Sequence, residues 1–165
     1  MNKNVKPIPE GYHTVTPSLV INDGPAALEF YKKALGAKDI TSINGPDGKM
    51  VHAEMKIGNS IIMLNSAHAD HPGHAENCPM SPAEMKGTTS SFYVYVEDAD
   101  AAIKRAVTAG AELTMPVTDM FWGDRMGNVR DPFGYMWTIA TRVSIPTEKE
   151  MAAGMKEFYA ETAKA

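Results

Sequence analysis

The chain has 165 residues, 44% of them hydrophobic, with one cysteine and a formal net charge of −4. This composition predicts an ordered globule in a reducing compartment, and the scattered lysines and arginines exclude the basic stripe of a nucleic-acid-binding protein. Because no apolar run approaches the roughly 18 residues that cross a bilayer and residues 1–13 lack the apolar core of a secretory signal, we expect a cytoplasmic protein with no membrane partner.

The first half of the chain predicts the element order βαβββ. Residues 13–21 alternate as a strand, and residues 22–37 follow as a helix with Asp23 as its N-cap and Gly36 at its C-terminal end. Turn residues then separate three expected strands, at 38–43, 49–57 and 60–65.

The second half repeats this order. A strand at 89–97 precedes a helix at 98–111, in which Asp98 and Gly110 repeat the places of the two cap residues in the first helix. Three further strands are expected, at 112–117, 124–130 and 135–143. Because a βαβββ unit leaves one sheet face bare, we expect two such units to pair through their sheets or across a dimer.

A C-terminal helix completes the predicted organisation. Thr147 and Glu150 have the spacing of a capping box, so the tail is expected to be helical. The expected parts are a first module, a connector, a second module and the C-terminal helix, at 12–66, 67–87, 88–143 and 144–165.

Several segments together resemble a known superfamily. The helix ALEFYKKALGA and the closing RDPFGYMWTIA are similar to the vicinal oxygen chelate (VOC) superfamily, on its glyoxalase and bleomycin-resistance branch. The pieces HAEMKIGNSIIML and FWGDRMGNVRDPFGYMWTIATRV resemble its PhnB-like subgroup more narrowly. The resemblance spans roughly residues 12–143 and implies an α+β fold, in which two βαβββ modules form a curved mixed sheet around a cavity, usually within a homodimer.

Strand alternation assigns side chains to the two faces of the expected sheets. Ser91, Tyr93 and Tyr95 share one face of their strand, opposite Phe92 and Val94. Large side chains on a face without a helix favour a ligand pocket or an interface. The alternative is an ordinary antiparallel sheet with one solvated face.

The resemblance also bears on metal binding. Metal-dependent members of that superfamily carry histidine and glutamate ligands near the start of each module's first strand and in its last strand. The resemblance aligns these positions with Thr16, Met63, Ser91 and Thr138. Hydroxyl and thioether groups bind divalent ions far more weakly than imidazole or carboxylate groups do. We therefore expect no metal and no other cofactor, and we expect these four side chains to contact a ligand instead.

His52 and Glu54 are the candidates for chemistry. They share one face of their expected strand with Met50 and Lys56, and lie about 7 Å apart along it. His52 is predicted to act as a general base that Glu54 orients. The pair also suits part of a displaced metal site, for which no third ligand is evident, or a solvated groove.

Three residues near the last strands are further ligand-binding candidates. Arg125 is suited to hold an anionic group, since its planar fork matches carboxylate or phosphate, but it also suits an ion pair with Glu54 or Asp119. Phe121 and Trp122 are expected on a loop at the mouth of the cavity, where they form a lid or a stacking wall for a flat ligand. Core packing of one ring and dimer contact by the other is the alternative.

The stretch HADHPGHAENC in the connector contains His68, His71, His74 and Cys78. The spacing permits a metal site if the backbone turns between the histidines, but structural zinc sites usually add paired cysteines. A flexible or dimer-contacting linker is the expectation that the composition favours.

The sequence leads to three functional hypotheses. The first is a metal-independent binding protein for small molecules, a homodimer that sequesters a toxic compound in its cavity. The second is a metal-dependent lyase, isomerase or ring-cleaving dioxygenase of the same superfamily. The third makes the aromatic face an oligomer interface. The residues expected to line the cavity are Tyr93, Tyr95, His52, Glu54, Met63, Trp122, Arg125 and Thr138.

Overall fold

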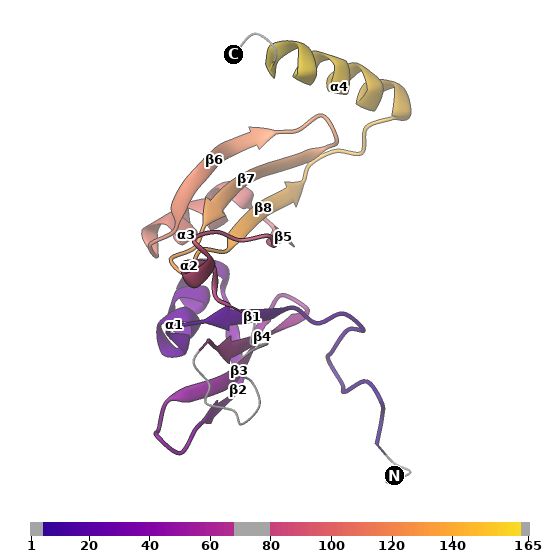
Figure 1. Ribbon diagram of the computed structural model, residues 1–165. Coiled ribbons are helices and arrows are strands. Elements are labelled where there is room, and N and C mark those ends of the chain that lie inside the picture. Colours follow the sequence, from indigo (N-terminus) through magenta and orange to yellow (C-terminus); the bar gives the residue numbers. More distant parts are fainter. Residues whose placement is uncertain (1–4, 68–79, 163–165) are drawn as a thin grey trace. The chain divides into compact units, whose positions relative to one another are not determined.

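The computed structural model describes residues 5–67 and 80–162. The chain divides into two compact units, Met1–Thr88 and Thr89–Ala165, coloured from indigo to magenta and from rose to yellow in Figure 1. Among the described residues, no helix is long and apolar enough to cross a membrane.

The first unit has a four-stranded mixed sheet with the strand order β1-β4-β3-β2. Strand β1 is parallel to β4, and the other neighbours are antiparallel. Its elements are β1 (Ser18–Ile21), α1 (Gly24–Leu35), β2 (Lys38–Asn44), β3 (Met50–Ile57), β4 (Ser60–Ser66) and the short α2 (Pro82–Met85).

The second unit repeats this topology, with the strand order β5-β8-β7-β6 and β5 parallel to β8. Its elements are β5 (Ser91–Tyr95), α3 (Ala99–Thr108), β6 (Glu112–Asp119), β7 (Asp124–Arg130), β8 (Met136–Arg142) and α4 (Glu148–Thr162). The predicted α+β class, with two βαβββ modules and a C-terminal helix, is confirmed.

Caps fix where the helices begin and end. The side chain of Asp23 accepts a hydrogen bond from the Ala26 amide at 3.1 Å, and Asp98 accepts one from Ala101 at 2.9 Å. Helix α1 ends at Gly36, whose φ of 66° is the left-handed conformation that glycine adopts without strain. These N-terminal carboxylates satisfy amides that the first turn of a helix leaves without a partner.

The capping box predicted for α4 is present. The Glu150 carboxylate accepts hydrogen bonds from the amide and the hydroxyl of Thr147, at 2.7 and 2.8 Å, and the Thr147 hydroxyl lies 3.3 Å from the Glu150 amide. An equivalent box at Ser81 and Glu84 starts α2, which the sequence analysis did not predict. The reason is its length, since a four-residue helix shows no apolar period.

One face of each sheet is covered by the helix of its own unit. In the first unit, Leu19, Met55 and Leu64 are buried on the side of α1, which buries Tyr31 and Ala27. Truncating one such side chain to alanine typically lowers the free energy of unfolding by about 2–5 kcal/mol.

The second unit follows the same rule. Trp137 and Ile139 of β8 and Val129 of β7 are buried on the side of α3, which contributes Ile103 and Ala106. The alternate side chains of these strands lie on the opposite, open face of each sheet. This open face is where functional side chains can meet a ligand.

The turn before β8 requires particular residues of the segment DPFGYMW. The buried carboxylate of Asp131 accepts hydrogen bonds from the amides of Phe133 and Tyr135 and from the indole of Trp137, each at 2.9 Å. Gly134 has a φ of 94°, which only glycine adopts readily. One aspartate therefore fixes the turn and the first buried aromatic side chain of β8.

Met50 corrects one predicted face. Alternation placed it with His52 on the open face, but a register irregularity between Ile43 and Asn44 of β2 shifts the start of β3. Met50 is buried against Gly24 at the start of α1, where a β-carbon on that glycine would overlap the methionine side chain. A β-bulge is not visible in the apolar pattern, which explains the error.

Two strands, β1 and β5, are much shorter than predicted. Strand β1 starts at Ser18 rather than 13, because Pro17 has no amide hydrogen and residues before it follow an irregular path. Strand β5 covers Ser91–Tyr95 within the predicted 89–97. The connector histidines His68, His71 and His74, with Cys78, lie outside the described residues.

Candidate functional site

The open face of the second sheet carries two tyrosines. The side chains of Tyr93 and Tyr95 are 47% and 57% exposed, while the residues between and beside them on β5 face α3. Their ring centroids lie 5.1 Å apart with the planes inclined by 48°. The two rings thus form a continuous aromatic surface, as alternation predicted.

A buried aspartate holds both tyrosines. Asp124, at the start of β7, is only 1% exposed, and its Oδ2 accepts hydrogen bonds from the hydroxyls of Tyr93 at 2.8 Å and Tyr95 at 3.0 Å. Its Oδ1 forms an ion pair with Arg142, its register partner on β8, and lies 2.8 Å from Nε. This contact does not have the geometry of a hydrogen bond. A buried carboxylate is tolerated because a positive charge and hydroxyl donors replace its water.

This cluster restricts the tyrosine rings. Each ring is attached to β5 at one end and hydrogen-bonded to Asp124 at the other, so neither ring turns freely. Burial, followed by the hydrogen bond to Asp124, raises the pKa of Tyr93 to about 12. The Tyr93 phenol therefore remains a neutral donor to the carboxylate at physiological pH.

Two further aromatic rings border this surface. The ring of Trp122 packs edge to face on Phe121, with centroids 4.9 Å apart, and its side chain reaches the Tyr93 hydroxyl. Phe121 also contacts Phe158 of α4, with centroids 6.0 Å apart. Phe121 therefore anchors the C-terminal helix, whereas Trp122 lies beside the tyrosines.

Polar and thioether groups continue the open face along β7 and β8. The Thr138 hydroxyl donates to Asn128 at 2.9 Å, and the sulfur of Met126 accepts from the Tyr93 hydroxyl at 3.4 Å. Ser91 is exposed at the start of β5 and is paired with Met136. The predicted residues Ser91 and Thr138 thus share the face of the tyrosines.

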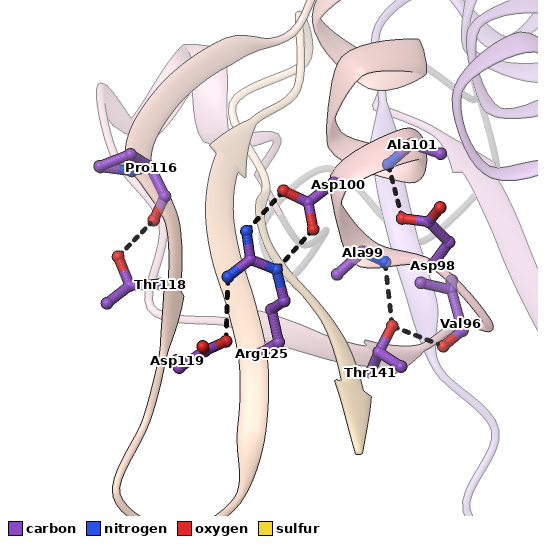
Figure 2. A network of polar contacts seen from close by, with 10 residues as sticks. All are labelled: Val96, Asp98, Ala99, Asp100, Ala101, Pro116, Thr118, Asp119, Arg125 and Thr141. Atoms are coloured by element: carbon purple, nitrogen blue, oxygen red, sulfur yellow. Dashed lines mark hydrogen bonds and ion pairs between the residues drawn. The ribbon is translucent and has the colours of Figure 1, made fainter. Parts of the chain in front are cut away.

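Arg125 occupies a different place from the one predicted. Its guanidinium donates to both carboxylate oxygens of Asp100 on α3, at 2.6 and 2.7 Å, and to Asp119 on β6 at 2.9 Å (Figure 2). Because Asp124 and Met126 point to the tyrosines, Arg125 between them points to the helix side. The structure corrects the expectation that Arg125 faces the ligand; of the alternatives, the ion pair with Asp119 is the one formed.

The Arg125 network is a structural contact. It joins the first turn of α3 to β6 and β7, and hydrogen bonding to Arg125 lowers the pKa of Asp100. Beside it in Figure 2, the Thr141 hydroxyl accepts from the Ala99 amide and donates to the Val96 carbonyl, both at 2.9 Å. These contacts hold α3 on the sheet.

The open face of the first sheet carries a polar network around His52. Nδ1 of His52 lies 2.9 Å from Oδ1 of Asn65, whose amide group contacts the Ser18 hydroxyl at 2.6 Å. Nε2 of the same ring lies 3.4 Å from Oε1 of Glu54, and the other oxygen of Glu54 accepts from the Tyr12 hydroxyl. The structure thus brings together His52 and Glu54, as their spacing predicted.

This network has the parts of an acid–base pair. His52 and Glu54 have side chains that are 24% and 14% exposed, so both are shielded but reachable. Asn65 fixes the imidazole on one side, and Tyr12 fixes the carboxylate, which raises the pKa of the tyrosine. The His52 imidazole is oriented by a contact at one nitrogen and faces a carboxylate at the other. Such a ring can transfer a proton at a defined atom.

Several residues of these sites were not predicted from the sequence, among them Tyr12, Asn65 and Asp124. Tyr12 precedes the first strand, and Asn65 and Asp124 lie at strand ends, so no local pattern marks them. A cross-strand signal was available for Asn65, since β3 and β4 form a hairpin that pairs it with His52. Asp124 depends on the pairing of β7 with β8 and on the parallel neighbour β5.

A groove of about 1250 Å³ lies on the helix side of the first unit. It runs between α1 and the β2–β3 hairpin and includes Leu28, Lys32, Asp47 and Met50. His52 and Glu54 do not line it, so it is separate from the acid–base network.

The topology of the two units also occurs in a known superfamily. Residues 12–139 match the family described as the Glyoxalase/Bleomycin resistance protein/Dioxygenase superfamily. The chain belongs to this superfamily. The sequence resemblance to this branch of the VOC superfamily is thereby confirmed at the level of the superfamily.

Relatives and solved structures agree with this membership. The uncharacterized protein Rv0887c of Mycobacterium tuberculosis (strain ATCC 25618 / H37Rv) is 37% identical over 141 residues, covering 86% of this chain and 81% of that protein. The X-ray structure of the Arabidopsis thaliana gene product At5g48480 is 27% identical with a TM-score of 0.61, covering 78% of this chain and 98% of that chain. The crystal structure of TioX from Micromonospora sp. ML1 is 25% identical with a TM-score of 0.60, with coverage of 78% and 98%.

The internal repeat is consistent with the positions that the resemblance aligned with VOC metal ligands. The helix caps Asp23 and Asp98 are separated in sequence by the same number of residues as Thr16 and Ser91, and as Met63 and Thr138. The strand pairings agree, since Ser18 pairs with Met63 and Tyr93 pairs with Thr138.

Thr16 and Met63 keep separate places. Thr16 precedes β1, and its hydroxyl donates to the His13 carbonyl at 3.0 Å. Met63 lies on the open face of the first sheet, opposite Glu54 on β3.

The donor set does not fit the metal centre of this superfamily. The four corresponding positions, Thr16, Met63, Ser91 and Thr138, carry three hydroxyl groups and a thioether, which are weak ligands for a divalent ion. Within residues 5–67 and 80–162, no three His, Cys, Asp or Glu side chains are placed to hold a metal ion. His52 and Glu54 supply two donors at most.

Proposed function

We propose that this VOC protein binds a small organic molecule on the open face of its second unit, without a metal ion. The observation that carries the proposal is the pair of half-exposed tyrosine rings, both hydrogen-bonded to a buried carboxylate. Burying an aspartate carboxylate is unfavourable unless hydrogen bonds or an opposite charge replace its water. Tyrosines that only cover the surface do not require such a group beneath them.

Pre-organisation is the physical reason for this assignment. A side chain that is already immobile loses little conformational entropy when a ligand binds, so rigid aromatic groups give affinity efficiently. Tyr93 and Tyr95 meet this condition through Asp124, and Trp122 extends the surface. Ser91 and Thr138 add polar groups on the same face.

The wider assignment rests on superfamily membership and on sequence motifs. The proposal includes a homodimer, a cytoplasmic location and the sequestration of a toxic compound. It also includes the PhnB-like subgroup, which the segments HAEMKIGNSIIML and FWGDRMGNVRDPFGYMW support. Phe121, placed against α4, contributes to this site by supporting Trp122.

A titration with 2-naphthamide, a flat neutral probe, tests the proposal. Tyr93→Ala should abolish calorimetrically detectable binding while leaving the circular dichroism spectrum unchanged, because it removes half of the aromatic surface. Tyr159→Ala is the matched control, since Tyr159 is an exposed tyrosine of α4 outside this cluster. Undiminished affinity in Tyr93→Ala would refute the assignment.

The network around His52 favours a second candidate function, an enzyme that transfers a proton. In this alternative His52 removes a proton from a carbon next to a carbonyl group and Glu54 holds the ring, as its contacts allow. Exchange of the carbon-bound protons of dihydroxyacetone in D₂O, followed by NMR, tests it. The wild type should exceed His52→Gln by at least about a hundredfold, and equal rates would exclude the enzyme.

The metal-dependent lyase, isomerase or dioxygenase is decided by metal analysis. The superfamily's usual metal positions hold poor ligands, so protein purified without chelators should contain no stoichiometric metal. Stoichiometric bound metal would place this hypothesis first.

A further inference from the structure

The charged groups beside the tyrosines are unequally accessible. Asp124 is buried, whereas the side chain of Arg142, its ion-pair partner, is 49% exposed. Both lie on the open face, because they are register partners on β7 and β8. A ligand that approaches the tyrosine rings therefore meets the guanidinium and not the carboxylate.

The guanidinium of Arg142 has N–H donors that are not used by its contacts with the described residues. Its Nε lies 2.8 Å from Asp124, and its Nη1 donates to the Trp122 carbonyl at 3.0 Å. Among the described residues, Nη2 has no hydrogen-bond partner. Two contacts hold the planar group in place, and about half of the side chain is exposed.

The structure assigns to this surface a ligand class, planar aromatic anions, with the ring on Tyr93 and Tyr95 and a carboxylate-type group on Arg142. This inference rests on the proposed function and specifies its substrate class. Arginine binds a carboxylate through charge-assisted hydrogen bonds, which are stronger than neutral ones. Flat ligands are favoured because tyrosine rings stack best on another ring.

Two other ligand classes fit less well. A cationic ligand would have to displace Arg142 to reach Asp124, whose acceptor Oδ2 is already occupied by two hydroxyls. An aliphatic acid uses Arg142 but leaves the ring surface without a stacking partner. The combination of aromatic ring and anion satisfies both features.

Calorimetry with three probes tests the inference without any mutation. The probes are 2-naphthoate, its neutral counterpart 2-naphthamide and the non-aromatic cyclohexanecarboxylate. The wild type should bind 2-naphthoate about fivefold to tenfold more tightly than either of the others, which is the range expected for one half-exposed charge-assisted contact. Equal affinity for naphthoate and naphthamide would overturn the inference.

A double variant separates the charge from the fold. Asp124→Asn with Arg142→Gln removes both charges together, so no unpaired carboxylate remains in the buried site. It should lose the preference for naphthoate over naphthamide, whatever its affinity for naphthamide itself. Arg130→Gln is the control, because Arg130 lies at the other end of β7, paired with Glu112, and its loss should change nothing.

The outcomes distinguish this inference from the proposed function. A preference for naphthoate that survives in the double variant, or that vanishes in Arg130→Gln, would overturn the role of Arg142. If Tyr93→Ala still binds naphthamide like the wild type, the proposed function itself fails. Naphthamide binding that requires Tyr93, with no gain for naphthoate, would leave the function standing and exclude the anion.

Discussion

At the scale of single residues, Asp124 determines what the open face can do. Strand alternation predicts that Tyr93 and Tyr95 share a face, because side chains alternate on any strand. It does not predict the hydrogen bonds of their hydroxyls, which depend on how β5, β8 and β7 are paired. The direction of Arg125 was missed for the same reason, since it follows from the register of β7.

Tyr93 gives a prediction for alkaline pH. Its pKa of about 12 lies above the value near 10 of an unfolded tyrosine. The folded state therefore holds this proton more tightly, so its contribution to stability is complete below about pH 10 and is lost between about pH 10 and pH 12. The difference in Tm between the wild type and Tyr93→Phe should shrink across that interval. A constant difference would contradict the assigned environment.

Asp124 gives a prediction for stability. Asp124→Ala removes the acceptor of two tyrosine hydroxyls and the partner of Arg142. We expect the free energy of unfolding to fall by about 2 kcal/mol, the sum of two net hydrogen bonds. Asp124→Asn keeps an acceptor and should lose less in urea unfolding. An equal loss in both variants would show that the hydroxyls do not depend on this side chain.

At the scale of elements, the caps and the apolar periods were readable from the sequence, but irregular backbone was not. The N-cap aspartates, the box at Thr147 and the chain order βαβββ of the elements in each half follow from local rules. The irregular register near Met50 does not, because a bulge depends on the partner strand. The candidate site was therefore predicted in part: its strands were found, but Tyr12 and Asn65 were not.

The contact between α4 and the β6–β7 turn gives a prediction at this scale. A β-carbon at Gly154 would overlap that of Phe121, so Gly154→Ala should lower the free energy of unfolding by about 1–3 kcal/mol, although alanine favours a helix. Adding Phe121→Ala to the Gly154→Ala variant should relieve this loss of stability. Ala153→Gly is the matched change in the same helix and should cost about 1 kcal/mol regardless of Phe121. A stabilising Gly154→Ala would mean that α4 does not pack on Phe121.

At the scale of the whole molecule, the repeat of βαβββ was visible in the sequence because both halves place a capped helix after their first strand. That repeat, with superfamily membership, establishes the fold class. It does not establish a ligand, since one fold serves many chemistries. The ligand class had to be inferred from the side chains of one sheet face.

Metal removal gives a prediction for the intact protein. Because the counterparts of the VOC metal ligands are hydroxyl and thioether groups, dialysis against a chelator should leave Tm and the affinity for 2-naphthoate unchanged. A loss of either, restored by adding a divalent metal, would show that the chain holds a metal ion after all.

The central claim is that the tyrosine face of the second unit binds a flat organic ligand. The most direct measurement is a crystal structure of the full chain with saturating 2-naphthoate. The account predicts electron density for the naphthalene ring against Tyr93 and Tyr95, with the carboxylate toward Arg142. Ligand density elsewhere, or a tyrosine face closed by packed protein side chains, would contradict it.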